Sequence, residues 1–200
     1  MFYKTKISSL IKEVELRQPP VIITVNEFDE ESTQKFSELM CKAQNSGQKV
    51  IPIIIDSYGG QVYSLLTMIS MINSSSVPVA TIIQGKAMSC GAILASFGTK
   101  GMRYMDPDST LMIHDVSSIA FGKIEELKSN ARESERLNKK LYKMMAKNCD
   151  RSEDYFTNLI HDKGHADWFL EAEEALKHGI VDHIKIPELK INIDVNIFLE

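Results

Sequence analysis

Three short runs of β-branched residues, each followed by a helical pattern, limit the folds open to this chain more than any other feature. At five or six residues, each run is too short for a helix and suits a buried strand. Because parallel strands need crossover connections, the repeated order predicts an α/β fold built from β-α units around a largely parallel sheet. The predicted strands are Val21–Val25, Val50–Ile55 and Val79–Ile83, and the helical patterns cover residues 29–44, 62–72 and 92–97.

Shorter elements are expected in the second half of the chain. A small-residue turn at Gly85–Gly91 is predicted to end the third strand unit. A charged segment at residues 122–148 has apolar residues at helical spacing, but it is too polar for a central helix. We expect it to project from the core or to pack on another subunit. Further strands are predicted at Arg103–Met105, Thr110–His114 and Ile180–Ile184, and helices at Ser152–His161 and Glu171–His178.

Composition excludes several classes of protein. The length of 200 residues suits one domain, and a formal net charge of −4 argues against a nucleic-acid partner. No stretch approaches the ~18 uninterrupted apolar residues of a membrane span, and the first residues lack the apolar core of a signal peptide. Cys41, Cys90 and Cys149 are widely spaced and odd in number, which favours free thiols in a reducing, cytoplasmic setting.

A serine at a strand-to-helix turn is the first candidate for chemistry. Ser89 lies among small residues that permit a tight turn, where its hydroxyl would be exposed. The Cys90 amide would stand at the following helix start, able to stabilise an oxyanion. The turn Asp56–Gly60 would add glycine amides nearby if the two strands are neighbours. The competing interpretations are an ordinary helix cap and an ordinary strand-to-helix turn.

A nucleophilic serine needs a base and a group that orients the base. His114 ends an apolar strand where a site is expected, although a partly buried structural histidine is the alternative. Asp167 stands beside apolar residues that could bury it, and Asp115 and Asp182 are its rivals. His161 and a histidine four residues later have no evident third ligand, so we expect no metal site and no cofactor.

From about residue 20 to 184 the sequence resembles the ClpP family, the self-compartmentalising serine peptidases of the crotonase-like superfold. Four motifs in the family's order carry the resemblance. They are Asp56-Ser57-Tyr58-Gly59-Gly60 for its Ser-Pro-Gly-Gly loop, Ala87-Met88-Ser89-Cys90-Gly91-Ala92 for its nucleophile motif, Leu111-Met112-Ile113-His114 for its histidine strand, and Asp167-Trp168-Phe169-Leu170 with the segments at 173–175 and 178–182 for its acid region.

The resemblance assigns roles to single residues. It implies Ser89 as nucleophile, His114 as base and Asp167 as the residue that orients the base. It implies an oxyanion hole from the Gly59 and Cys90 amides. The peptide would bind as an added strand along Gly60, Gln61 and Val62. It further implies a homo-oligomer of heptameric rings stacked in pairs, joined by a projecting handle helix at about 115–148.

The sequence departs from the family pattern without losing a triad residue. Tyr58 replaces the usual proline, Cys90 the usual methionine and Trp168 the usual arginine, and Asp115-Val116 replaces Gln-Pro. Only about seven residues precede the first helix expected from the resemblance, at Ser8–Glu13, which argues against docking to an AAA+ unfoldase ATPase. The expected domains are an N-terminal helix segment at 1–19, the peptidase domain at 20–186 and a C-terminal tail with an edge strand at 187–200.

The leading hypothesis is a cytoplasmic serine endopeptidase that hydrolyses peptides or unfolded proteins inside an oligomeric ring chamber. One alternative enzyme is a signal-peptide-peptidase-like Ser/Lys protease with Lys123 or Lys128 as the base, although His114 makes that lysine unnecessary and no membrane anchor is evident. Another alternative is a catalytically silent or structural ring subunit of the same fold. An acyl-CoA enzyme of the crotonase type would share the fold but would need no Ser/His/Asp set.

Overall fold

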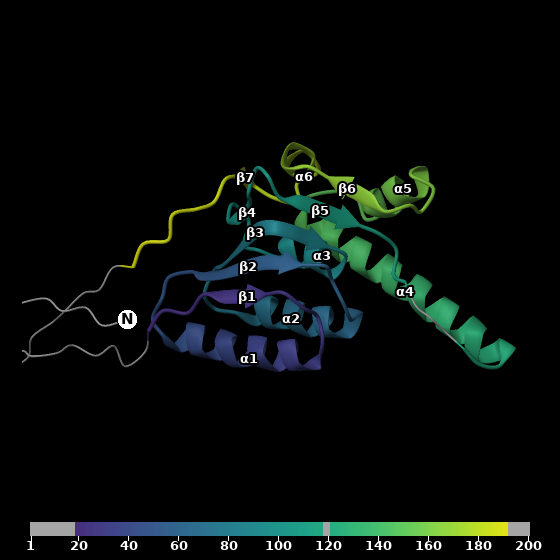
Figure 1. The fold of residues 1–200 in the computed structure, drawn as a ribbon, viewed down its shortest axis with the longest axis horizontal. Coiled ribbons are helices and arrows are strands. Elements are labelled where there is room, and N and C mark those ends of the chain that lie inside the picture. Colours follow the sequence, from purple (N-terminus) through teal and green to yellow (C-terminus); the bar gives the residue numbers. More distant parts are fainter. Residues whose placement is uncertain (1–18, 118–120, 192–200) are drawn as a thin grey trace, which may run out of the picture.

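The computed structural model describes residues 19–117 and 121–191 of the chain, which form six helices and seven strands. Figure 1 shows their arrangement. The strands are β1 (Ile23–Val25), β2 (Ile51–Ser57), β3 (Val79–Met88), β4 (Arg103–Met105), β5 (Thr110–Ile113), β6 (Trp168–Leu170) and β7 (His183–Ile184). The helices are α1 (Glu30–Asn45), α2 (Val62–Ser74), α3 (Cys90–Ala95), α4 (Ile124–Asn148), α5 (Tyr155–Asp162) and α6 (Ala172–His178).

The strands form one sheet that is parallel except at one pairing. Strands β1, β2, β3, β4 and β7 lie in this order and pair in parallel. Strand β5 pairs in parallel with the end of β3, and β6 pairs antiparallel with β5. The predicted α/β fold with a largely parallel sheet is therefore confirmed. Because β2, β3 and β5 are neighbours, their carboxyl ends meet at one edge, where such folds place their ligands.

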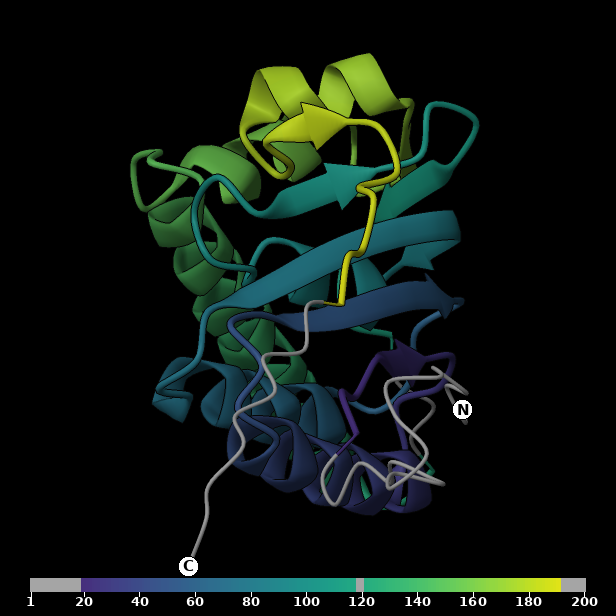
Figure 2. The same ribbon diagram turned by 90° about the vertical axis from the view of Figure 1, so that its left-hand side faces the viewer.

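Helices lie at both ends of the sheet. Figures 1 and 2 show α1 and α2 side by side near β1 and β2, whereas α5 and α6 gather near β6 and β7. The start of α1 is capped because the Asp29 carboxylate accepts a hydrogen bond from the Ser32 N–H at 2.7 Å. Its buried face consists of Phe36, Met40 and Ala43, at the helical spacing visible in the sequence.

Helix α4 combines a projecting half with a packed half. Figure 1 shows its N-terminal end extending beyond the rest of the molecule, and Ile124 there is 70% exposed. Nearer its C-terminus, Leu137, Leu141 and Met145 are buried. The expected projecting helix is thus confirmed. None of the helices in the described ranges combines the length and the apolar character needed to cross a membrane.

The prediction of a turn at Gly85–Gly91 is wrong for most of these residues. Strand β3 continues to Met88 because Lys86, Ala87 and Met88 pair with Thr110, Leu111 and Met112 of β5. The turn is confined to Ser89, and α3 begins at Cys90, two residues before the predicted helix start. The cysteines are free thiols, as expected, with Cys90 and Cys149 buried and Cys41 exposed.

Both expected terminal segments consist largely of residues that the structure does not describe. The predicted N-terminal helix at Ser8–Glu13 lies among residues 1–18, which are not described. The predicted edge strand at 187–200 is not found in residues 187–191, and the remaining residues of that tail lie outside the described part.

A buried ion pair ties β4 to the segment before β7. The Arg103 guanidinium donates to both carboxylate oxygens of Asp182, at 2.8 and 2.5 Å, and to the carbonyls of Asn148 and Gly179 at 3.1 and 2.9 Å. Arg103 is only 3% exposed. This pairing joins the sheet to the ends of α4 and α6 and occupies one of the three carboxylates considered as partners for His114.

Candidate active site

Ser89 occupies a strained turn at the carboxyl end of β3. Its backbone has φ 54° and ψ −118°, a conformation that non-glycine residues rarely adopt. The Ser89 N–H donates to the Met112 carbonyl at 2.8 Å, and the Ser89 carbonyl accepts from the Ile93 N–H at 3.3 Å. These bonds hold the turn between β5 and α3. Such strain is characteristic of functional turns that expose a reactive side chain.

The glycine turn after β2 lies directly against Ser89. A Cβ atom added to Gly59, where φ is +106°, would stand 2.7 Å from the Ser89 Cβ and 3.2 Å from its Oγ. A Cβ added to Gly60, where φ is +152°, would stand 2.6 Å from the Phe28 carbonyl oxygen. Only glycine fits at either position without displacing backbone or the serine. The two turns, which the sequence predicts to lie together if their strands are neighbours, are therefore in contact.

The candidate oxyanion donors differ in their surroundings. The Cys90 N–H is at the first position of α3, where an amide has no acceptor within its own helix. The Gly59 N–H donates to the buried hydroxyl of Ser57 at 3.0 Å. The Cys90 thiol donates to the Gly60 carbonyl at 3.2 Å, and burial raises the pKa of this thiol to about 11. Cys90 therefore stays protonated near neutral pH and fixes the glycine loop.

Replacement of Gly59 by alanine should slow any reaction at Ser89, because the new methyl group would overlap the serine side chain. We expect the Gly59→Ala rate of covalent labelling by a fluorophosphonate to fall by about 100-fold, the cost of an ångström-scale misplacement. Gly47→Ala is the control: Gly47 also has positive φ, +78°, but nothing lies within 4 Å of its added Cβ. Equal labelling rates for the two variants would contradict the contact between Gly59 and Ser89.

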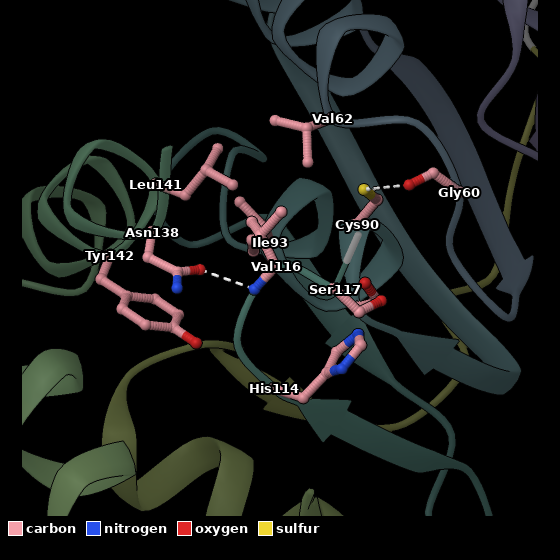
Figure 3. Close-up of a pocket in the computed structure, with 11 residues that line it drawn as sticks. Gly60, Val62, Cys90, Ile93, His114, Val116, Ser117, Asn138, Leu141 and Tyr142 are labelled. Carbon is pink, nitrogen blue, oxygen red and sulfur yellow. Dashed lines mark hydrogen bonds between the residues drawn. The ribbon is translucent and has the colours of Figure 1, made fainter. Parts of the chain in front are cut away.

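His114 and Ser89 line the same cavity. Met88 of β3 is in register with Met112 of β5. His114, two residues beyond Met112, therefore lies beside the turn at Ser89. The His114 side chain is 23% exposed. The cavity has a volume of about 50 Å³, and Figure 3 shows His114 and Cys90 opposite Leu141 of α4. The structure thus brings together the serine and the histidine that the sequence suggested as nucleophile and base.

Asp167 approaches His114 but is not buried as the sequence led us to expect. The distance from its Oδ1 atom to His114 Nδ1 is 3.8 Å, longer than a hydrogen bond, and its side chain is 57% exposed. The prediction that apolar neighbours bury Asp167 is therefore wrong. Strand β6 begins at the next residue, where Trp168 and Leu170 turn into the core, so Asp167 stays in the preceding loop.

The two rival carboxylates have other partners. Asp115 accepts from the Tyr142 hydroxyl at 3.1 Å and contacts His165 Nδ1 at 2.7 Å. Asp182 is bound to Arg103 at the other end of the sheet. Burial alone would raise the pKa of Asp182, but the hydrogen bonds and charge of Arg103 hold it below its usual value. Among the three carboxylates, Asp167 is therefore the one that faces the His114 imidazole.

Two of the three residues expected to bind the peptide line the cavity beside Ser89. Gly60 and Val62 line the cavity, whereas Gln61 is exposed and does not. Gln61 precedes α2, and its N–H donates to the Phe28 carbonyl at 2.7 Å. This bond and the parallel bridge between Phe28 and Gly60 keep the loop extended.

Helix α4 supplies a wall that sequence reasoning missed. Asn138, Leu141 and Tyr142 line the cavity on the side across from Cys90, and the Asn138 Oδ1 atom accepts from the Val116 N–H at 2.6 Å (Figure 3). The apolar spacing of Leu141 was visible in the sequence, but nothing local marked Asn138. The alternative lysine bases are elsewhere: neither Lys123 nor Lys128 lines the cavity, and Lys128 pairs with Glu125 at 2.8 Å on the projecting part of the helix.

Comparison with known proteins places these observations in a family context. The family model described as Clp protease matches residues 6–188. A relative from Deinococcus radiodurans, named "ATP-dependent Clp protease proteolytic subunit", is 34% identical over 146 residues. That alignment covers 73% of this chain and 69% of the relative. The region that the family model matches contains Ser89, the glycine turn, His114 and Asp167.

Proposed function

The chain belongs to the Clp protease family and is a serine-type peptidase, and from this premise we propose that Ser89, His114 and Asp167 form its catalytic triad. The observation that carries the proposal is the shared cavity of Ser89 and His114, with the Gly59 backbone packed against the serine. Asp167 is the carboxylate that faces the histidine. The three side chains come from the ends of β3 and β5 and the start of β6, so one edge of the sheet positions all of them.

The proposed reaction proceeds through an acyl-enzyme. His114 accepts the proton of the Ser89 hydroxyl as its oxygen attacks the peptide carbonyl, and then donates that proton to the leaving amine. The Cys90 N–H, joined by the Gly59 N–H, stabilises the oxyanion of the tetrahedral intermediate. Gly59 must then share or exchange its bond to Ser57. A water molecule, deprotonated by His114, hydrolyses the ester and restores the serine.

The proposed substrate is an extended peptide or an unfolded protein. The loop at Gly60–Val62 is kept extended by its pairing with Phe28. A peptide that adds as a strand along such a loop gains affinity from backbone contacts, with little sequence preference. The small cavity beside Ser89 takes one side chain of that strand. A folded domain cannot present an extended segment along this loop without local unfolding.

The proposed assembly is a homo-oligomer of heptameric rings stacked in pairs that enclose the active sites. Support comes from the start of the projecting helix α4 and the residues just before it, where Phe121, Ile124 and Leu127 are 91%, 70% and 39% exposed. Exposed apolar side chains grouped on one projecting element are typical of a surface that binds another protein. We assign the peptidase unit to residues 20–186, with the handle at about 115–148.

A catalytically silent ring subunit is the second candidate. It is favoured by the 3.8 Å separation of His114 and Asp167 and by the bond that occupies the Gly59 N–H. In that case the chain would assemble but would not turn over peptides.

Incubation of the purified protein with a permanently unfolded protein and with its folded counterpart tests the proposed function. The expected result is a set of short peptides from the unfolded chain, detected by mass spectrometry, and an intact folded counterpart. Ser89→Ala is the matched control, with the same oligomer mass by native mass spectrometry and no products. Assembled wild-type protein that leaves the unfolded chain intact would favour the silent subunit.

A further inference from the structure

Two histidine–aspartate contacts link the same two segments of the chain. The first segment follows β5 and contains His114 and Asp115, and the second precedes β6 and contains His165 and Asp167. Strands β5 and β6 are antiparallel, with Ile113 in register with Trp168. The two segments therefore extend the same ladder beyond its last paired residues, and each supplies one histidine and one aspartate to the other.

The two contacts differ in length. His165 Nδ1 lies 2.7 Å from Asp115 Oδ2, a hydrogen bond, whereas His114 Nδ1 lies 3.8 Å from Asp167 Oδ1. The other carboxylate oxygen of Asp115 accepts from the Tyr142 hydroxyl of α4 at 3.1 Å. Asp115 is thus fixed from two sides. Within the described residues, the contact with His114 is the only ion pair that Asp167 makes.

On this basis, and resting on the proposed triad, we propose that Asp115 and His165 are positioning residues that hold the His114 and Asp167 segments together. The loop that carries Asp167 is exposed from His161 to Asp167, so packing does little to hold it. The hydrogen bond of His165 to Asp115 anchors this loop two residues before Asp167. Tyr142 extends the same anchor to α4, which also lines the cavity that contains Ser89.

The turn that ends α5 fixes the backbone of His165. Its φ is +58°, and its N–H donates to the Ile160 carbonyl at 3.0 Å. The side chain is 58% exposed, so burial of the ring is not what holds it. Its bond to Asp115 is the contact that directs this residue toward the His114 segment.

A double-mutant cycle tests the proposal through the rate at which a fluorophosphonate labels Ser89. Asp115→Asn keeps an oxygen for Tyr142 but removes the carboxylate from His165, and His165→Asn suits the positive φ. We expect each single variant to be labelled about 10- to 100-fold more slowly, as for a misplaced catalytic group. We expect the double variant to be no slower than the slower single variant, because both changes break one contact.

The control is the ion pair of Glu135 and Lys139, 3.2 Å apart and exposed on α4. Glu135→Gln should be labelled at the wild-type rate. The peptide KM should stay unchanged in the Asp115 and His165 variants while kcat falls, since both residues lie away from the Gly60–Val62 wall. If Asp115→Asn fails to fold, the labelling rate of His165→Asn alone tests the proposal. His165 is exposed, so its substitution should not prevent folding.

Wild-type labelling rates in both single variants, or losses that multiply in the double variant, would overturn this inference alone. An assembled wild-type protein that is not labelled at all would overturn the proposed triad, and this inference with it.

Discussion

The His114→Ala variant is expected to hydrolyse a fluorogenic peptide about 10⁴- to 10⁶-fold more slowly than the wild type. The reason is that a serine hydroxyl is a weak nucleophile until a neighbouring base accepts its proton. His114 is the histidine that shares the Ser89 cavity. The measurement is kcat/KM of the assembled protein for that peptide, and Ser89→Ala is measured alongside. The two variants should lose activity to a similar extent, because triad residues act as a unit.

Asp167→Asn should have a smaller effect than His114→Ala. A neutral partner leaves the imidazole less well oriented, but the exposed position and the 3.8 Å separation make Asp167 a weaker partner than a buried, hydrogen-bonded carboxylate. Asp108→Asn, the same change at an exposed aspartate in the turn before β5, is the control and should retain full activity. An active His114→Ala enzyme, or an effect of Asp167→Asn that exceeds it, would contradict the assigned roles.

The Asp182→Ala variant is expected to lose about 3 to 5 kcal/mol of unfolding free energy, because it would leave a buried guanidinium without its counter-ion. Arg103 is 3% exposed and donates to both oxygens of Asp182. Urea unfolding followed by circular dichroism measures the change. The control is Lys100→Ala, which removes an exposed ion pair with Asp150 and should unfold nearly as the wild type does.

This ion pair also predicts how stability changes in acid. The pKa of Asp182 is lower in the folded state than in the unfolded chain, so its contribution is fully present above the unfolded pKa of about 3.9. The contribution is lost as pH falls through the lower, folded-state pKa. The stability difference between wild type and Asp182→Ala should therefore shrink below about pH 4. A difference that is independent of pH, or a variant as stable as the wild type at neutral pH, would contradict this account.

The sequence predicted those features for which the local pattern of apolar residues agrees with the topology of the sheet. Buried β-branched runs followed by helical patterns predicted the parallel sheet, and the sheet then placed Ser89 and His114 at one edge. The end of β5, beside His114, lies within one residue of the predicted strand end, whereas β3 ends five residues beyond the predicted one. The same reasoning placed the glycine turn beside the serine, because β2 and β3 are consecutive strands of one sheet.

Features that depend on distant partners were not predictable in this way. Strand β3 runs to Met88 because β5 pairs with its last residues, and nothing before Met88 signals that partner. The exposure of Asp167 depends on where β6 begins, not on its apolar neighbours. The cavity wall from Asn138 and the contact of Asp115 with His165 join segments 22 and 50 residues apart, respectively.

Covalent labelling of the purified, assembled protein with a fluorophosphonate tests the central claim most directly, since the reagent reacts with a serine that a neighbouring base activates. Intact mass spectrometry would compare wild type, Ser89→Ala and His114→Ala. We predict one adduct per wild-type chain, located on Ser89 by peptide mapping, and no adduct on either variant. Wild-type protein that stays unlabelled, or an adduct that persists in Ser89→Ala, would contradict the assignment of Ser89 as the nucleophile.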